Sequence, residues 1–206
     1  MSARLLVSVL LPVRDAAATL ETALHSIARQ SVDSFECIVV DDASSDESLA
    51  IAERAARQDA RLRVVGGEGK GLVAALERGL RECRGRFIAR MDGDDWMHRD
   101  RLGLQLARLT SEPDLAAVGT HVRMFPRPLS DGMHQYETWL NSLRSPEDVA
   151  LNAFVECPIA HPTLMIRRTV LARLCYRDHG WPEDYDLILR LLAAGERVAV
   201  MEKRLH

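Results

Sequence analysis

The first half of the chain alternates short apolar runs with segments whose apolar residues recur at helical spacing. The apolar runs predict strands at Leu5–Leu11, Phe35–Val40, Leu62–Val65 and Arg86–Met91, the first of them ended by Pro12. Helices are predicted between these strands, over residues 20–30, after residue 44 and over residues 72–83. Strands separated by single helices are typical of right-handed crossovers and a parallel sheet.

For two of these helices, the sequence also predicts individual capping and core-facing residues. Ser44 and Glu47 have the spacing of a capping box and predict the start of the second helix. The apolar positions expected to face the core are Leu49, Ala52 and Ala56 on the second helix, and Leu72, Leu76, Leu80 and Cys83 on the third.

The second half of the chain is less regular. Asp100 is predicted to cap a helix, residues 115–125 to form a strand and residues 163–168 to return to the sheet. Further helices are predicted at Trp139–Leu143, at Pro146–Phe154 with Ser145 as N-cap, and at Asp184–Ala194 with Gly195 as its C-terminal cap. Because no repeat or linker interrupts the pattern, we expect residues 1–206 to form one domain of two halves.

Composition and charge narrow the class of protein. The 206 residues are 47% hydrophobic and 28% charged, which is typical of a globular domain. The net charge of −3 and the lack of a dense Lys/Arg stretch argue against a nucleic-acid partner. No apolar run reaches the roughly 18 residues of a transmembrane helix, and the first strand is too short for a signal peptide. The four widely spaced cysteines predict buried free thiols in a reducing cytoplasm.

Carboxylates follow two of the predicted strands at the point where each strand ends. Asp41 and Asp42 follow the second strand, and Asp92, Asp94 and Asp95 follow the fourth. Ligands of open parallel sheets bind outside the carboxyl ends of the strands, so these residues are candidates for a binding site. Mg²⁺ or Mn²⁺ would neutralise such a cluster and hold a diphosphate. The alternative is that the carboxylates only form turns and helix caps.

A glycine-rich segment, residues 66–71, matches neither common phosphate-binding pattern. A Walker loop needs Ser or Thr after Gly-Lys, where this chain has Gly71, and an earlier glycine where it has Val64. The dinucleotide pattern would need its third glycine at Leu72. The diphosphate of a bound nucleotide is therefore predicted to be held by a metal ion.

These residues resemble the family-two glycosyltransferases of the GT-A fold. The resemblance extends over "VSVLLPVRDAAATLETALHSIARQS", "FECIVVDDASSDES", "GLVAALERGLRECRGRFIARMDGDD", "HPTLMIRR" and "PEDYDLILRLLAAGE". It implies a Rossmann-like three-layer α/β/α sandwich with a mostly parallel central sheet. It also implies a nucleotide-sugar-binding half at residues 1–95 and an acceptor-binding half at residues 96–206.

The resemblance implies a set of nucleotide-binding residues: Pro12, Val13, Arg14, Asp41, Asp42, Lys70 and Asp92. Within this set Asp42 is expected to read uracil, with Asp41 in support. Lys70 has two interpretations, a phosphate contact and an exposed lysine at a helix start. The expected metal ligands are Asp94 and Asp92, holding Mg²⁺ or Mn²⁺. The sequence departs from the usual family pattern at Asp15 and Glu77, where asparagine is common.

The resemblance makes Asp184 the general base. A carboxylate at a helix start stays ionised in the field of the helix dipole, which suits it to accept a proton from the acceptor hydroxyl. The alternative is that Glu183 and Asp184 are ordinary acidic residues of a first helical turn. On the acceptor side we place Glu183, His161, Trp96 and Trp181. His161 has an equal claim to be a structural histidine, and the two tryptophans to be core residues.

The expected activity is inverting transfer of a sugar from a nucleotide-diphosphate sugar, with UDP favoured, to a hydroxyl of a carbohydrate, glycolipid or other acceptor. A sugar nucleotidyltransferase is the alternative enzyme, although the first loop, "PVRDAAATL", lacks the glycine-rich basic signature expected of one. A catalytically silent nucleotide-binding domain is the third reading. The expected location is the cytoplasm, with peripheral attachment to the inner membrane face left open.

Overall fold

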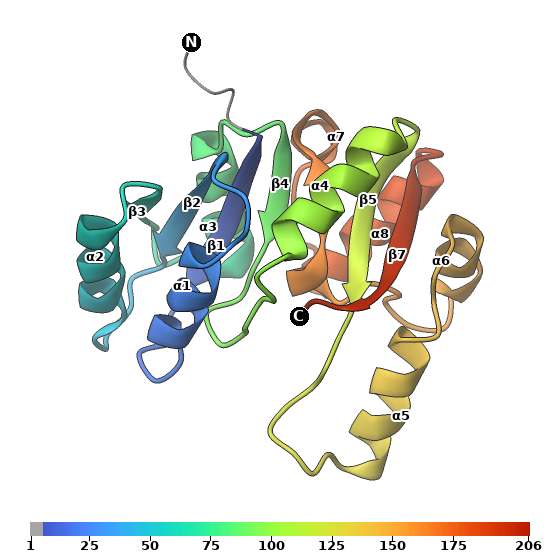
Figure 1. Cartoon of the computed structure of the whole chain (residues 1–206), viewed down its shortest axis with the longest axis horizontal. Coiled ribbons are helices and arrows are strands. Elements are labelled where there is room, and N and C mark those ends of the chain that lie inside the picture. Colours follow the sequence, from blue (N-terminus) through green and yellow to red (C-terminus); the bar gives the residue numbers. More distant parts are fainter. Residues whose placement is uncertain (1–5) are drawn as a thin grey trace.

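The computed structural model describes residues 6–206, which fold around one seven-stranded sheet (Figure 1). The strands are β1 (Val7–Val13), β2 (Phe35–Asp41), β3 (Leu62–Gly66), β4 (Phe87–Arg90), β5 (Leu115–His121), β6 (Met165–Arg167) and β7 (Arg197–Arg204). Their order across the sheet is β3-β2-β1-β4-β6-β5-β7. Because only β6 runs antiparallel to its neighbours, the predicted α/β fold with a mostly parallel central sheet is confirmed.

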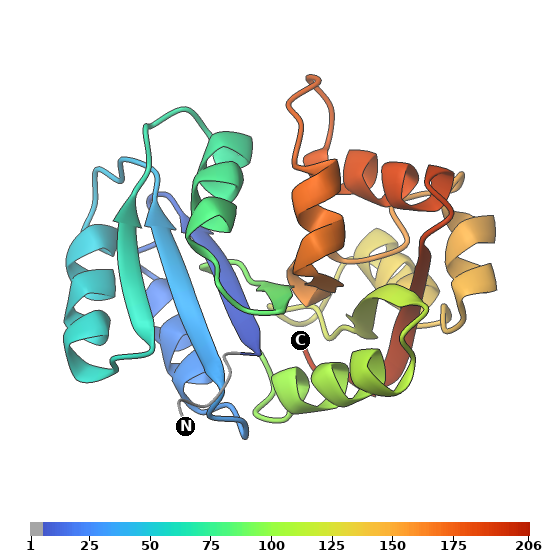
Figure 2. The same cartoon turned by 90° about the horizontal axis from the view of Figure 1, so that it is seen from above.

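Helices cover both faces of the sheet and complete three layers (Figure 2). They are α1 (Leu20–Ala28), α2 (Ser48–Gln58), α3 (Leu72–Glu82), α4 (Arg101–Ser111), α5 (Asp131–Leu140), α6 (Pro146–Asn152), α7 (Arg168–Leu174) and α8 (Glu183–Ala193), with a 3₁₀ turn η1 (His161–Thr163). One apolar core lies between the sheet and α1, α2 and α4. A second core lies between the sheet and α3, α6, α7 and α8.

The central strand β1 shows why these elements form. All seven of its residues are buried, and Val9 and Leu11 belong to one core while Leu10 belongs to the other. A strand covered on both faces needs apolar side chains on both, which is the continuous run seen in the sequence. Pro12 lies within β1 instead of ending it, because pairing with β4 stops at Leu10 and no donor is needed there.

Three details of the predicted helices are wrong. Ser44 does not cap α2, which begins at Ser48, and its hydroxyl instead accepts a hydrogen bond from the backbone of Asp15. Leu49 and Leu72 are exposed, because each lies at the first turn of its helix, beyond the sheet. Asp100 holds the N-cap position of α4 without a capping hydrogen bond from its side chain.

In the second half, β5 ends at His121, four residues before the predicted end. The helix expected at Trp139–Leu143 spans residues 131–140 as α5, with Ser130 as its N-cap. By contrast, α6 has the expected Ser145 cap and Pro146 at its start, and α8 ends before Gly195 with φ of 75°. Neither α7 nor β7 was predicted.

The four cysteines are free thiols, and Cys37, Cys83 and Cys157 are buried. Burial raises the pKa of Cys83 and of Cys157 to about 12. Cys175 is partly exposed, so the prediction of burial is wrong there. Among residues 6–206, no helix has the length and apolar character needed to cross a bilayer.

Candidate functional site

The carboxyl ends of β1, β2 and β4 bring three loops to one edge of the sheet. The backbone N–H of Asp42, just beyond β2, donates to the carbonyl of Val13 at 2.8 Å. On the other side of β1, the N–H of Met91 donates to the carbonyl of Leu10 at 3.2 Å. The residues of both acidic motifs, Asp41-Asp42 and Asp92 to Asp95, therefore flank the end of the central strand.

The loops after β1 and β2 are joined by reciprocal hydrogen bonds. The carboxylate of Asp15 accepts from the backbone and the hydroxyl of Ser45 at 2.7 and 3.0 Å, and these bonds lower the pKa of Asp15. In return, the hydroxyl of Ser48 and the carboxylate of Asp46 accept from the backbone N–H groups of Ala16 and Ala17. Because each loop satisfies the other, this wall of the site is preorganised, and Asp15 takes part in it.

Asp42 organises the glycine-rich segment. Its buried carboxylate accepts hydrogen bonds from the backbone of Gly69 and of Gly71, both at 2.8 Å. Arg14 lies 3.6 Å from the same carboxylate. A side chain at Gly67 would meet an Asp42 oxygen at 2.8 Å and the Asp41 carbonyl at 2.9 Å, so only glycine fits there. This link between Asp42 and the glycines was not predicted from the sequence.

Asp41 differs from Asp42 in its partners. One of its carboxylate oxygens accepts from the backbone of Ser44 at 3.3 Å, while the other is buried without a hydrogen-bond partner in the described residues. A buried oxygen of this kind is costly unless a further donor reaches it. Lys70 pairs with Glu68 at 2.5 Å and is largely exposed, just before the start of α3.

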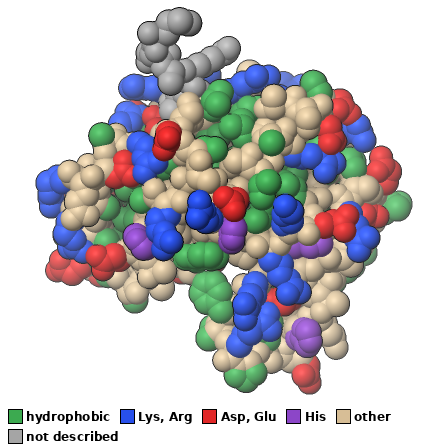
Figure 3. Space-filling model, viewed as in Figure 1, with side chains coloured by type: hydrophobic (Ala, Val, Ile, Leu, Met, Phe, Trp, Pro, Cys, Tyr) green, Lys and Arg blue, Asp and Glu red, His purple; other side chains and the backbone are tan. Residues whose placement is uncertain are grey.

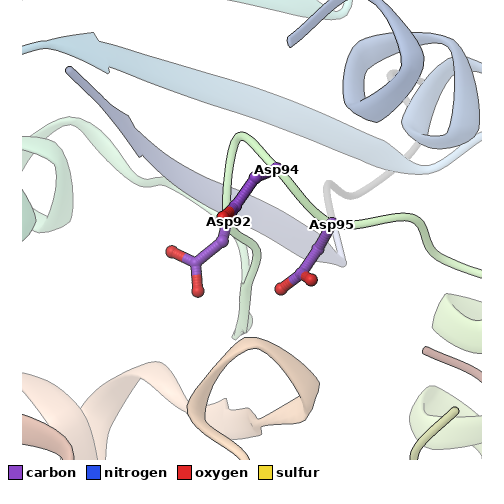
Figure 4. A group of neighbouring side chains, drawn as sticks. All are labelled: Asp92, Asp94 and Asp95. Atoms are coloured by element: carbon purple, nitrogen blue, oxygen red, sulfur yellow. The ribbon is translucent and has the colours of Figure 1, made fainter. Parts of the chain in front are cut away.

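Asp92, Asp94 and Asp95 form a compact carboxylate cluster. One oxygen from each lies within 4.8 Å of the others, and their side chains extend to the same side of the loop after β4 (Figure 4). Asp94 is exposed, and no other described residue donates a hydrogen bond to its carboxylate. Hard oxygen ligands at this spacing suit Mg²⁺ or Mn²⁺, so the cluster fits the predicted divalent ion.

Two buried arginines lie beneath the cluster. Arg90 contacts an oxygen of Asp92 at 2.6 Å. Arg101, fully buried, donates to the carbonyl of Arg90 at 2.9 Å, and burial lowers its pKa to about 9. In the sequence, Arg90 is distinguished only by being a charged residue within an apolar run that predicts a buried strand. Together these cations explain part of how the aspartates tolerate one another.

Within the cluster, the pKa values of Asp94 and Asp95 are shifted in opposite directions. Although Asp94 is exposed as a residue, its carboxylate is partly desolvated, and this desolvation, with the charges of Asp95 and Asp92, raises the pKa of Asp94. Burial acts in the same direction on Asp95, but the contact with His206 and the positive charges of His206, Arg90 and Arg101 together outweigh it and lower the pKa of Asp95. The His206 ring nitrogen lies 2.9 Å from Asp95. Asp94 is therefore the member of the cluster that most needs a cation.

Glu183 and Asp184 occupy the first turn of α8 beside a buried histidine. The two ring nitrogens of His161 lie 3.5 Å from a Glu183 oxygen and 3.1 Å from the Tyr176 hydroxyl. An oxygen of Asp184 accepts from the backbone of Tyr185 at 2.7 Å. His161 thus has a structural hydrogen-bonding role that also fixes Glu183.

His161 also relates the two acidic motifs in space. Burial lowers its pKa, the positive charge of Arg90 lowers it further, and contact with Glu183 opposes both effects. The charges of Asp184 and Asp92 act on the same ring. Arg90, which contacts Asp92, also donates its backbone N–H to the carbonyl of Leu164 just after η1, at 2.8 Å, and His161 of η1 contacts Glu183, so the cluster after β4 and the start of α8 lie beside the same turn.

The two tryptophans assigned to the acceptor side are half-exposed. Trp96 is 47% and Trp181 is 48% exposed, so the alternative of core packing is wrong for both. Trp96 lines a cavity of about 570 Å³ next to the acidic cluster. Trp181 lies against Tyr185, with ring centroids 6.2 Å apart. A larger cavity of about 790 Å³, between α1 and α2, contains none of the predicted site residues.

Solved structures share this fold. Staphylococcus aureus TarS aligns with a TM-score of 0.79 over 97% of this chain and 59% of that chain, at 20% identity. The mannosyltransferase PcManGT of Pyrobaculum calidifontis aligns with a TM-score of 0.74 over 98% of this chain and 58% of that chain, at 23% identity. At these identities the likeness concerns the fold, and it confirms the GT-A architecture.

Sequence comparisons identify the family. EpsE of Bacillus subtilis (strain 168) is 32% identical over 97% of this chain and 71% of its own length. AmsE, the amylovoran biosynthesis glycosyltransferase of Erwinia amylovora, is 31% identical over 87% of this chain and 66% of its own length. EpsH of Bacillus subtilis (strain 168) is 38% identical, but only over 53% of this chain and 32% of its own length. The model of "Glycosyl transferase family 2" matches residues 8–175, and the chain belongs to this family.

Proposed function

We propose that this chain is a metal-dependent glycosyltransferase that moves a sugar, with inversion, from a UDP-sugar to an acceptor hydroxyl. The observation that carries the proposal is the carboxylate cluster of Asp92, Asp94 and Asp95, with oxygens within 4.8 Å of one another. It lies beside the preorganised loops after β1 and β2, where a nucleotide would bind. The polysaccharide context of AmsE agrees with this class of activity.

Structures of relatives support the donor class. TarS has been crystallised with UDP and with UDP-GlcNAc, and the solved structure of PcManGT is a complex with GDP-Man and Mn²⁺. Glucosyl-3-phosphoglycerate synthase of Mycobacterium tuberculosis has been crystallised with Mn²⁺ and UDP. We propose by analogy that Asp92 and Asp94 hold Mg²⁺ or Mn²⁺ and that Pro12, Val13 and Arg14 contact the nucleoside.

Under this proposal, Asp42 reads the base. Its two oxygens already accept hydrogen bonds from the glycine-rich segment, but each carboxylate oxygen can accept more than one. The uracil imide N–H is therefore a suitable additional donor. The buried, unpartnered oxygen of Asp41 supports a second contact on the same side.

In the proposed reaction, the two acidic motifs have different roles. A bound Mg²⁺ or Mn²⁺ would supply charge neutralisation to the leaving diphosphate. Asp184 takes the proton of the acceptor hydroxyl as the new glycosidic bond forms at the anomeric carbon. The contact of His161 with Glu183 keeps the start of α8 in place, which holds Asp184 in position. Residues 1–95 then serve the donor and residues 96–206 the acceptor, and a cytoplasmic location stays a prediction.

A panel of UDP-, GDP-, ADP- and CMP-sugars with Mn²⁺ tests the activity. A glycosyltransferase is expected to release the nucleoside diphosphate slowly by hydrolysis, even without its acceptor. With pyrophosphate added, a nucleotidyltransferase would instead form the nucleoside triphosphate and sugar 1-phosphate, and a silent domain would release none of these products. Either of these last two results contradicts the proposal.

Competition between UDP and GDP tests the base. The protein is expected to bind UDP more tightly, and Asp42→Asn is expected to reduce the difference, because an amide can offer its N–H₂ where the carboxylate only accepts. The measurement is displacement of a fluorescent UDP analogue. Stronger displacement by GDP would favour a GDP-sugar and reject the assignment of Asp42.

A further inference from the structure

A cavity of about 570 Å³ lies between the loop after β4, the loop after β5 and the end of the chain. Its lining combines aromatic rings with basic groups, including Trp96, Phe125, Arg123, Arg127, Arg204 and His206. Phe125 is 59% exposed, so both of the aromatic rings named here are accessible. Aromatic faces and guanidinium groups are the usual protein contacts of sugar rings and of oxyanions, respectively.

The arginines of this cavity are incompletely neutralised. Arg127 pairs with the buried carboxylate of Glu137 at 2.8 Å. Among residues 6–206, Arg123 and Arg204 form no ion pair within 4.0 Å, although the charge of Arg204 also helps to lower the pKa of Glu137. Figure 3 shows basic side chains gathered beside hydrophobic ones where α5 joins the rest of the molecule. The cavity therefore has an excess of positive charge that a bound anion would balance.

The cavity adjoins the acidic cluster on its second-half side. A neighbouring cavity of about 240 Å³ is lined by Asp94 and Asp95, and it shares Arg123, Phe125 and His206 with the larger one. A ligand in the larger cavity can thus reach the position where the donor sugar is expected. The arginines themselves belong to residues 96–206, and the loops after β1 and β2 do not line the cavity.

We propose that this cavity binds an oxyanion, phosphate or carboxylate, carried by the acceptor saccharide, with Trp96 and Phe125 against the sugar ring. The inference rests on the proposed function and narrows its acceptor from any hydroxyl compound to an anionic saccharide. Guanidinium groups pair with phosphate and carboxylate in a bidentate manner, and unpaired arginines are suited to that contact. They also offset the repulsion between an anionic acceptor and the donor diphosphate.

The test is a titration of the protein saturated with UDP and Mn²⁺, followed by tryptophan fluorescence. The ligands are glucose 1-phosphate, glucuronic acid, methyl glucoside and inorganic phosphate. At least one anionic sugar is expected to bind roughly tenfold or more tightly than methyl glucoside. Comparison of the two anionic sugars tells phosphate from carboxylate. Trp96→Phe is expected to abolish the signal.

The variants Arg123→Gln and Arg204→Gln are each expected to remove most of this preference while UDP affinity stays unchanged. Arg84→Gln is the matched control, because the Arg84 side chain is also exposed and forms no ion pair within the described residues, but lies at the opposite end of β4, where only the backbone of Arg84 contacts a carboxylate, that of Glu36. An equal loss in the control would overturn the proposal. So would equal binding of neutral and anionic sugars.

Two further outcomes separate this inference from the proposed function. If the arginine variants weaken UDP binding as much as sugar binding, the arginines hold the donor and the inference is wrong. If inorganic phosphate binds as tightly as the preferred anionic sugar, the cavity recognises no saccharide and the inference is again wrong. The titration is repeated in metal-free buffer without nucleotide, so the cavity is tested even if UDP does not bind and the proposed function fails.

Discussion

The two halves of the sheet edge differ in how many of their polar side chains have hydrogen-bond or ion-pair partners. In the first half, the loops after β1 and β2 satisfy each other, and Asp42 is hydrogen-bonded to two glycines of the segment after β3. In the second half, Arg123 and Arg204 have no carboxylate partner among the described residues, and Trp181 is half-exposed. The first wall is hydrogen-bonded before any ligand binds except at one buried oxygen of Asp41, while the second presents exposed side chains that still lack partners.

This difference agrees with the proposal that the first half binds the nucleotide and the second half binds the acceptor. A ligand of fixed chemistry, such as a nucleotide, is bound well by a preorganised wall, because little conformational entropy is lost on binding. Under the proposed function, the acceptor contacts are expected on loops such as the one after β5, because loops vary more between homologues than the elements they connect. The comparison predicts that changes in the two halves will affect different measurements.

The largest effect is expected at Asp184. Asp184→Asn keeps the shape of the side chain and removes its basicity, so kcat should fall roughly 10²–10⁴-fold. Affinity for UDP with Mn²⁺ should stay unchanged, because the base acts only as the proton moves. Transfer rates with a true acceptor, together with calorimetry of UDP, provide the measurement.

Asp178→Asn is the matched control, since Asp178 lies in the exposed segment before α8. It should leave both quantities as in the parent. Retention of most transferase activity in Asp184→Asn would remove Asp184 from the mechanism and weaken the assignment of the second half to the acceptor.

The second effect concerns stability. Gln105 is fully buried in α4 and donates to the carbonyls of Val118 and Thr163, at 2.9 and 2.8 Å, while accepting from Arg101. Gln105→Met is nearly isosteric but leaves those groups unpaired, so the free energy of unfolding should fall by about 2–4 kcal/mol. Urea denaturation measures it.

The exposed Gln58 at the end of α2 offers the control, because Gln58→Met should change stability by less than about 0.5 kcal/mol. A large loss of stability in Gln105→Met but not in Gln58→Met would show that the second half has a well hydrogen-bonded interior beneath its exposed loops. A Gln105→Met protein as stable as the parent would mean that these buried hydrogen bonds contribute nothing net.

The third effect is confined to the first half. Gly67→Ala places a methyl group against Asp42 and the Asp41 carbonyl, and overpacking of this kind costs about 1–3 kcal/mol. UDP affinity should fall by roughly tenfold if the strain displaces Asp42. Gly66→Ala is the control, because no atom lies within 4 Å of its added methyl group. Equal UDP affinity in the two variants would show that the wall tolerates displacement.

The sequence predicted the parallel strands and the acidic motifs because both depend on local pattern. A continuous apolar run such as that of β1 predicts a strand buried on both faces, and this prediction requires no knowledge of residues far away in the sequence. The positions of Asp42 and Asp94 follow in turn, since strand ends converge on one edge of a parallel sheet.

Features that depend on distant residues were not predicted. The buried Arg101 touches groups of β4 and His206, which lie 11 and 105 positions away. The helix α5 begins earlier than expected because Ser130 caps it, whereas the apolar periodicity only emerges near Trp139. The unpaired arginines of the second half come from the loop after β5 and from the end of β7, and no local spacing in the sequence indicates that they meet.

The central claim is that the cluster after β4 holds a divalent ion on which donor binding depends. Calorimetry of UDP tests it most directly, in Mn²⁺ and in metal-free buffer, with the parent, Asp94→Asn and Asp184→Asn. We predict that UDP binds the parent and Asp184→Asn equally in Mn²⁺, and that removing the metal or changing Asp94 weakens binding by roughly a hundredfold or more. Equal UDP affinity without metal, or in Asp94→Asn, would contradict the account.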